Sequence, residues 1–353
     1  MHNILKLMAE RRASDLHLTV GRPPLLRIDG QLVPIEGEPL TSDGTKELAY
    51  ALLTEEQMAA FEKQRELDFS YGVAKVGRFR VNLYRQRGSV GCAIRCIPYA
   101  IPTLEELGLP SVVKEFAERP NGLFLVTGPT GSGKSTTLAA IIDYINGRRR
   151  CHIITVEDPI EYLFHHKLAT IDQREVGTDT TSFAEALRHV MRQDPNVIMV
   201  GEMRDLETIH AALTLAETGH LIFATLHTSD TIHAMPRIID IFPPYQQQQI
   251  RVQLSMVLIG VLAQQLIPRK GQPGRALATE MMKVTTPVQN LIRENNLPQL
   301  YSVLQTSREA GMHTMNQSLS KLYKDGIISY EEAVRRTNNY DEFIALISSA
   351  KEG

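Results

Sequence analysis

The chain has 353 residues, 43% of them hydrophobic, and its 38 basic and 40 acidic residues give a net charge of -2. A chain of this length and composition can bury the cores of about two globular domains, which excludes an intrinsically disordered protein. The near-neutral charge lacks the basicity that a nucleic-acid-binding protein uses to displace counterions, so no nucleic-acid partner is expected. The three cysteines form no CxxC pair and are predicted to be reduced thiols, as is typical of a cytosolic protein.

Residues 1–98 are predicted to form a small α+β domain. Short alternating apolar runs predict strands, the pair Asp29-Gly30 is typical of a hairpin turn, and the apolar spacing over 41–64 predicts helix. The charged residues Glu10, Arg11 and Arg12 occur before any long apolar run, so the N-terminus is not expected to be a secretory signal.

Arginines alternate along one predicted strand of this domain. Arg78, Arg80 and Asn82 are spaced by two residues, so their side chains share one face of the strand, and Arg95 belongs to another strand. Guanidinium groups can bind phosphate oxygens through paired hydrogen bonds, and an arginine supplied by a neighbouring subunit can accelerate ATP hydrolysis. A solvated sheet face is the alternative, and the local sequence does not choose between the two.

Prolines mark 99–120 as a linker, because proline can neither donate a ladder hydrogen bond nor continue a helix. Apolar strands alternate with helical segments over 121–268, which predicts an α/β domain with a largely parallel sheet. Within it, Ser182 and Glu185 have the spacing of a capping box at a helix start. The apolar run 250–267 contains glutamines and a serine, and is predicted to be a buried helix rather than a membrane span. Residues 269–353 are predicted to be helical.

The segment GPTGSGKST, Gly128 to Thr136, matches the phosphate-loop pattern GxxxxGK[ST] and lies between an apolar strand and a helical run. Glycines let backbone N–H groups converge on phosphate oxygens, and the following helix adds its positive end. Lys134 supplies a positive charge and Ser135 a hydroxyl for Mg²⁺, so ATP with Mg²⁺ is the expected ligand. The residues expected to bind the nucleotide are Gly128, Thr130, Gly131, Ser132, Gly133, Lys134, Ser135 and Thr136.

Carboxylates follow two of the predicted strands. Glu157 and Asp158, with Glu161 behind them, end a strand where ligands of open parallel sheets bind, although a solvated acidic turn is the alternative. Glu202 ends the strand NVIMVGE and is the candidate to orient or deprotonate the attacking water, while Gly201 occupies the position where an aspartate usually helps to bind Mg²⁺. We therefore expect Glu157 or Asp158 to contact the metal through water.

Two histidines flank a further predicted strand, LIFATL. His227, at its carboxyl end, is expected to sense the γ-phosphate, since it follows a strand beside the phosphate loop. A structural role is favoured for His220, which precedes the strand.

The segments GPTGSGKST, ITVEDPIEY, NVIMVGEMRD and GHLIFATLHTSD, in this order, resemble the Walker A, Asp box, Walker B and His box of the secretion and pilus ATPase superfamily. The opening ASDLHLTVGRPPLLRIDGQL is similar to the PAS-like N-terminal domain of that superfamily, so the resemblance covers nearly the whole chain. It implies an α/β protein: a RecA-like P-loop ATPase domain preceded by a PAS-like α+β domain and followed by a helical C-terminal region.

Within the superfamily, the chain resembles the retraction ATPases of type IV pili. It begins almost directly with the PAS-like domain and lacks the paired cysteines of the zinc element carried by extension and secretion motors. The late segment PVQNLIREN is similar to the retraction motif AIRNLIRE but departs from it at the first three positions. The matching part of the motif is Asn290, Leu291, Ile292, Arg293 and Glu294.

The resemblance implies an enzyme that hydrolyses ATP to ADP and phosphate and couples hydrolysis to pilus retraction and twitching motility. It implies a homohexamer in which Arg80 and Arg95 of one subunit, with Arg78 behind them, approach the ATP held by its neighbour. A cytoplasmic location at the inner membrane is also implied, with peripheral membrane association through a pilus platform protein.

Three other readings stay open at this point. An ATPase that acts on nucleic acid is opposed by the near-neutral charge and the absence of tryptophan. An accessory ring subunit that depends on a paralogue for force is opposed by the intact Lys134, Ser135 and Glu202. A small-molecule kinase lacks an obvious lid or acceptor pocket in the sequence.

Overall fold

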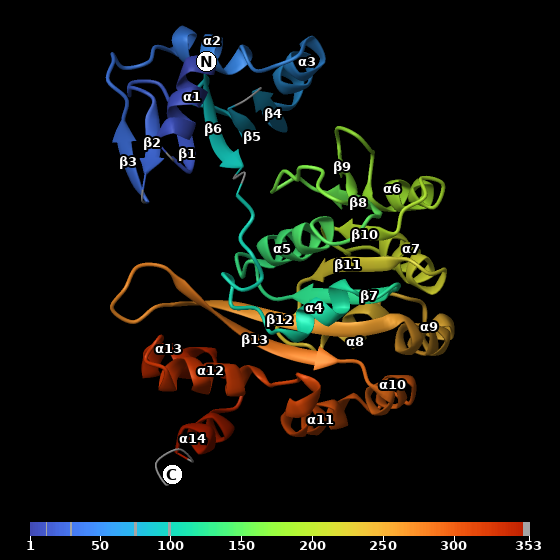
Figure 1. Ribbon diagram of the computed structural model, residues 1–353. Helices are drawn as coiled ribbons and strands as arrows, with labels where there is room; N and C mark the ends of the chain where they lie inside the picture. The colour runs from blue at the N-terminus through green and yellow to red at the C-terminus, as the bar shows by residue number, and fades with distance from the viewer. Residues whose placement is uncertain (12, 29, 74–75, 98–99, 349–353) are drawn as a thin grey trace. The chain divides into compact units, whose positions relative to one another are not determined.

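The computed structural model describes residues 1–11, 13–28, 30–73, 76–97 and 100–348. Contacts divide the chain into two compact units, the first formed by Met1–Ala100 together with Glu161–Leu163 and the second by Ile101–Ile160 and the chain from Phe164 onward (Figure 1). The boundary predicted between residues 98 and 99 lies outside the described residues.

An antiparallel sheet of six strands, in the order β3-β2-β1-β6-β5-β4, forms the centre of the first unit. The outer face of β5 presents Arg78, Arg80 and Asn82, while Phe79 and Val81 point into the core, as the alternation predicts. The strands are β1 Asp15–Leu18, β2 Leu25–Ile28, β3 Gln31–Pro34, β4 Glu66–Val73, β5 Gly77–Gln86 and β6 Ser89–Ile97.

Three helices pack on the apolar face of this sheet: α1 His2–Glu10, α2 Ser42–Tyr50 and α3 Glu55–Gln64. The helical segment predicted over 41–64 is thus two helices. The break has a local cause, because Thr54 forms a capping box with Gln57 and so starts a new helix.

A seven-stranded sheet, in the order β13-β12-β7-β11-β10-β8-β9, organises the second unit. All its strands run parallel except β13, which is antiparallel to β12. The largely parallel sheet predicted from the strand–helix alternation is therefore present. The strands are β7 Gly122–Thr127, β8 His152–Glu157, β9 Thr170–Glu175, β10 Val197–Val200, β11 Leu221–Leu226, β12 Leu258–Pro268 and β13 Arg275–Lys283.

Helices cover both faces of the parallel sheet. Phe124 and Val126 of β7 pack with α4 and α5, whereas Leu123 and Leu125 pack with helices on the other face. The helices within this part of the chain are α4 Val112–Ala117, α5 Lys134–Asn146, α6 Phe183–Val190, α7 Leu206–Glu217, α8 Ala234–Ile239 and α9 Pro244–Val257.

Helix starts follow the local chemistry. Ser182 caps α6 by accepting from the N–H of Glu185, but the carboxylate of Glu185 contacts Arg188 and His189 instead of closing the predicted capping box. Pro236 is the third residue of α8, where the missing N–H would have no helical partner, so the helix tolerates it.

The predicted linker differs from what the structure shows. Leu104, Val112, Val113 and Phe116 are buried in the core of the second unit, where α4 packs against α5. Residues 101–120 all belong to the second unit.

The run 250–267, predicted as one helix, was wrongly assigned. Helix α9 ends at Val257 and the chain continues as β12, which runs parallel to β7. A strand buried on both faces has a continuous apolar sequence, which is ambiguous between helix and strand. Gly260 fits this strand because an added Cβ would lie only 3.0 Å from Phe116 and 3.1 Å from Phe124. No helix within the described ranges is long and apolar enough to cross a membrane.

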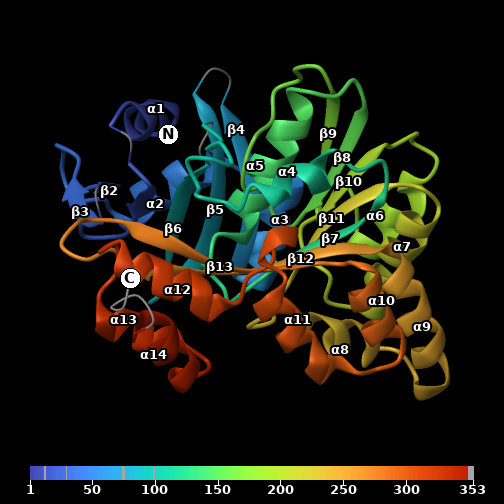
Figure 2. The ribbon, with the colours of Figure 1, turned by 60° about the horizontal axis from the view of Figure 1, so that its bottom comes forward.

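The C-terminal region is helical only after β13, so the prediction of helix from 269 onward was wrong over that strand. Figure 2 shows α12 beside β13, and the two elements are in contact. The elements here are α10 Thr286–Arg293, η1 Leu297–Gln299, α11 Leu300–Thr306, η2 Arg308–Ala310, α12 Met315–Lys324, α13 Tyr330–Arg336 and α14 Tyr340–Ser348.

A buried carboxylate connects this region to the loop after β11. Glu280 of β13 is 1% exposed and accepts hydrogen bonds from the N–H and Oγ1 of Thr231, at 2.9 and 2.7 Å, and from the N–H of Met315, at 3.2 Å. Burial raises the pKa of Glu280 despite these hydrogen bonds. Glu280 therefore joins the start of α12 to the loop that follows β11.

Candidate nucleotide-binding site

All four motifs lie at one edge of the parallel sheet. The phosphate loop follows β7, His227 follows β11, Glu202 follows β10, and Glu157 ends β8. These four strands are consecutive neighbours in the sheet and run in the same direction, so their carboxyl ends meet at a single edge. This edge is where open α/β sheets bind ligands.

The phosphate loop connects β7 directly to α5. Gly128, Gly131 and Gly133 have φ values of 147°, 78° and 88°, a backbone region that glycine enters without a steric penalty. Helix α5 begins at Lys134, and no side chain caps its first N–H groups. The loop and the helix start therefore present a row of backbone donors, which suits an anion such as phosphate.

Lys134 and Ser132 have the features of a ligand-binding loop. Lys134 is 8% exposed, and its Nζ donates to the carbonyl oxygens of Gly128 and Pro129 at 2.9 and 3.1 Å. The Oγ of Ser132 is buried and has no hydrogen-bond partner among the described residues. A buried hydroxyl without a partner is costly, and a bound phosphate oxygen would satisfy it.

The two acidic residues at the end of β8 have different environments. Glu157 is buried and accepts hydrogen bonds from Thr155 Oγ1 at 2.7 Å and Gln173 Nε2 at 3.1 Å. Asp158 is exposed, so the reading as a solvated turn suits it better than it suits Glu157. An added Cβ at Gly201 would lie 3.3 Å from the carbonyl oxygen of Val156, so a side chain at this position would require a small shift of the β8 backbone.

Glu202 lies at the centre of a charged group at the end of β10. Its carboxylate is 2.5 Å from Arg204 Nε and 3.3 Å from His227 Nε2. Burial acts to raise the pKa of Glu202, but hydrogen bonding to Arg204 and the charges of His227 and Arg204 outweigh it and lower the pKa. The structure thus joins the predicted general base to the predicted sensor histidine.

Residues that the sequence reasoning did not single out support the site. The motif predicts no role for Arg204, although its guanidinium contacts Glu202. Thr127 Oγ1 accepts from the N–H of Thr228 at 2.8 Å and so connects the phosphate-loop strand to the His-box loop. A polar residue ending an otherwise apolar strand is the signal that would have indicated Thr127.

His220 and Glu161 are two further residues that the sequence analysis considered for the site. The ring Nδ1 of His220 is 2.9 Å from the carbonyl oxygen of Leu215 at the end of α7, in agreement with the favoured structural reading. Glu161 is exposed and belongs to the first compact unit, whereas Glu157 belongs to the second.

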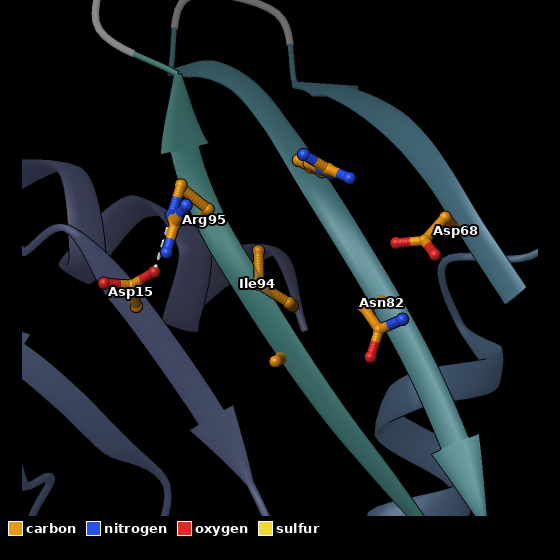
Figure 3. A pocket seen from close by; sticks show the side chains of 7 residues that line it. Asp15, Asp68, Asn82, Ile94 and Arg95 are labelled. Carbon is orange, nitrogen blue, oxygen red and sulfur yellow. Dashed lines mark hydrogen bonds and ion pairs between the residues drawn. The ribbon is translucent and has the colours of Figure 1, made fainter. Parts of the chain in front are cut away.

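Arg80 and Arg95 of the first unit border a pocket of about 190 Å³ on the outer face of the sheet. Arg80 of β5 is directly opposite Arg95 of β6, which is opposite Asp15 of β1. Figure 3 shows the side chains of Arg95 and Asp15 pointing toward each other, and Arg95 Nε lies 2.9 Å from the carboxylate. Arg80 is exposed, and both guanidinium groups are at the solvent side of the sheet. Asp68 and Asn82 complete the polar wall of the pocket.

The predicted retraction motif lies on α10, which packs against α9 and α11. Ile292 is buried and Leu291 packs against the same core, whereas Arg293 and Glu294 are exposed. The guanidinium of Arg293 donates to the Asn290 side chain at 2.5 Å. Only the two apolar members of the motif therefore have an evident packing role.

A family model described as Type II/IV secretion system protein matches residues 2–335. The chain belongs to this family. It is 46% identical to the type IV pilus retraction ATPase PilT of Pseudomonas aeruginosa, over 96% of this chain and 98% of that one. It is 40% identical to the type IV pilus ATPase PilU of the same organism, over 99% of this chain and 91% of that one.

Solved structures show the same relationship. The crystal structure of the pilus retraction motor PilT with bound ADP matches with a TM-score of 0.91 and 51% identity, over 97% of this chain and 98% of that one. The predicted resemblance to the secretion and pilus ATPases and the predicted α/β fold class are confirmed. These similarities do not favour the nucleic-acid, accessory-subunit or kinase readings.

Proposed function

We propose that this protein is an ATP-hydrolysing motor that powers retraction of type IV pili. The observation that carries the proposal is the meeting of the phosphate loop, Glu157, Glu202 and His227 at one sheet edge. The similarity over nearly the full length to the retraction motor PilT indicates which work the hydrolysis drives.

The chain's own residues suit Mg²⁺ bound together with ATP. Ser135 and the carboxylates after β8 and β10 supply oxygen donors, which Mg²⁺ prefers, but no cluster of three acidic, histidine or cysteine ligands occurs in the described parts of the chain. Mg²⁺ commonly relies on substrate phosphates and retained waters, so Ser135 would contact it directly and Glu157 or Asp158 through water. When bound, the ion neutralises charge on the phosphates.

In this proposal, each remaining residue has one task. Backbone N–H groups of the loop and the Lys134 ammonium hold the phosphates. The Glu202 carboxylate accepts a hydrogen bond from the attacking water and takes its proton as the water attacks. His227 lies within reach of Glu202, the proposed base, and is proposed to contact the γ-phosphate as well.

The active assembly is proposed to be a homohexamer, with Arg80 and Arg95 of one subunit acting on the nucleotide of its neighbour. Their position around a pocket on an exposed sheet face is what supports this role, since such a face leaves guanidinium groups accessible to another molecule. The ring is proposed to act from the cytoplasmic face of the inner membrane on a pilus platform protein.

The shared-site proposal is tested by mixing two inactive variants. Arg80→Ala lacks the arginine that acts on a neighbour, and Lys134→Ala lacks the lysine that acts within its own subunit. A mixed ring contains some interfaces with both residues intact, so we expect ATP hydrolysis to recover partially at intermediate ratios. Light scattering measured alongside activity establishes that a ring has formed. An absence of recovery at every ratio, in rings that do assemble, would assign Arg80 a structural role.

The pH dependence of hydrolysis tests the role of Arg204. Because Arg204 helps to lower the pKa of Glu202, replacing it with alanine raises that pKa, and Glu202 becomes protonated at a higher pH. We expect the acid limb of the kcat profile to move to higher pH in Arg204→Ala and to stay closer to that of the unmodified protein in Arg204→Lys, which keeps the charge. Identical acid limbs in all three proteins would show that Glu202 is not the group that titrates.

A further inference from the structure

Gln264 is a buried glutamine on β12 beside the phosphate loop. In the pairing of β12 with β7, Ala263 is opposite Thr127, so Gln264 follows at the point where β7 ends and the loop begins. Gln264 is only 1% exposed. A buried amide must satisfy its donors and acceptor within the protein, which makes its partners informative.

Both ends of the Gln264 amide contact the phosphate loop and its helix. Nε2 donates to the carbonyl oxygen of Ser132 at 2.7 Å, and Oε1 accepts from Thr137 Oγ1 at 3.0 Å. A carbonyl oxygen can only accept, so the Ser132 contact fixes the orientation of the amide. One side chain thus bridges the last turn of the loop and the first turn of α5, across Gly133 to Thr136.

The backbone of β12 also approaches the loop closely. An added Cβ at Gly128 would lie 2.4 Å from the carbonyl oxygen of Gln264, and one at Gly133 would lie 3.3 Å from its Nε2. Two glycines of the motif therefore fit directly against Gln264. The contact covers both the start and the end of the loop.

We propose that Gln264 is a positioning residue for nucleotide binding. Its amide holds Ser132 at a fixed distance from Thr137, and the backbone N–H groups between these residues then converge before the nucleotide arrives. Pre-organised donors bind more tightly because less conformational freedom is lost on binding. This inference rests on the proposed function, since it takes phosphate to be the ligand of the loop.

The test compares two neighbouring glutamines on the same strand. Gln264→Met keeps the length and approximate volume of the side chain but removes both hydrogen bonds, and Gln265→Met is the matched control. Gln265 follows directly in β12, its side chain points to the opposite face, and it is less buried. Affinity for a fluorescent ADP analogue, KM and kcat for ATP, and thermal unfolding are measured for both variants.

We expect Gln264→Met to weaken ADP binding and to raise KM by about tenfold or more, with a smaller change in kcat, because lost pre-organisation acts on binding. Gln265→Met should bind like the unmodified protein. A second pair addresses the other partner: Thr137→Val removes one of the two hydrogen bonds and should weaken binding, whereas Thr137→Ser keeps the hydroxyl and should restore it. If Gln264→Met does not fold, the two Thr137 variants still test the positioning role of Gln264.

The outcomes separate the two proposals. If the unmodified protein fails to bind ADP or ATP, the proposed function is wrong. If it binds nucleotide and both Gln264→Met and Thr137→Val fold and bind equally well, only the positioning role is overturned. A folded Gln264→Met with a lower melting temperature but unchanged ADP affinity would likewise assign Gln264 to stability alone.

Discussion

Replacing Lys134 with alanine is expected to abolish measurable ATP hydrolysis and to weaken nucleotide binding by at least about a hundredfold. A pair of unit charges about 4 Å apart contributes roughly 4 kcal/mol at an effective dielectric constant near 20, which exceeds the ~2.7 kcal/mol that a hundredfold change represents. The fold should persist, because the hydrogen bonds from Lys134 Nζ to Gly128 and Pro129 lie within the phosphate loop.

Nucleotide binding followed by fluorescence, with circular dichroism to establish folding, checks this expectation. The matched control is Lys167→Ala, which removes a half-exposed lysine paired with Asp143 in the same unit. That variant should hydrolyse ATP normally, since surface ion pairs contribute little. A folded Lys134→Ala protein that retained micromolar or tighter affinity for ATP would contradict the assignment of the loop.

Replacing Glu202 with glutamine is expected to lower kcat by roughly a hundredfold or more while leaving ATP binding intact. Glutamine has nearly the same shape, but it cannot accept the proton of the attacking water. The amide also loses the ionic contacts with Arg204 and His227, both of which help to keep the carboxylate ionised. ATP binding should persist, because the phosphate loop follows β7 whereas Glu202 follows β10.

Single-turnover hydrolysis, measured for Glu202→Gln beside Glu157→Gln, distinguishes the two carboxylates. Glu157 is hydrogen-bonded to Thr155 and Gln173 at the end of β8. Its replacement should therefore lower activity mainly by disturbing the position of the metal and of the residues that end β8. A varied Mg²⁺ concentration should therefore affect Glu157→Gln more than Glu202→Gln. Near-normal turnover in Glu202→Gln together with a large loss in Glu157→Gln would transfer the role of the base to Glu157.

The sequence was most informative where a motif has a fixed local geometry. The phosphate loop needs glycines at positive φ followed by a helix, and residues 128–136 contain both signals within nine positions. The order of strands could also be expected in part, since carboxyl ends of parallel strands meet at one edge. For that reason Glu157, Glu202 and His227 were predicted as site residues without any knowledge of distances.

Prediction failed where an element is defined by partners far away in the chain. The apolar run after Ile250 is compatible with helix or buried strand, and only pairing with β7 and β13 makes its second half a strand. The same long-range pairing brings Gln264 to the phosphate loop, so its importance was hidden when 250–267 was read as helix. Arg204 was overlooked for another reason, because an exposed arginine after a strand has many possible partners.

The carboxylate of Glu280 has a mechanical consequence for the second unit. It accepts hydrogen bonds from three donors, two from Thr231 and one from Met315, and separating either partner would leave a buried polar group without its hydrogen bonds. The loop after His227 and the start of α12 therefore resist being pulled apart. A displacement of that loop would therefore pull on the start of α12 through Glu280.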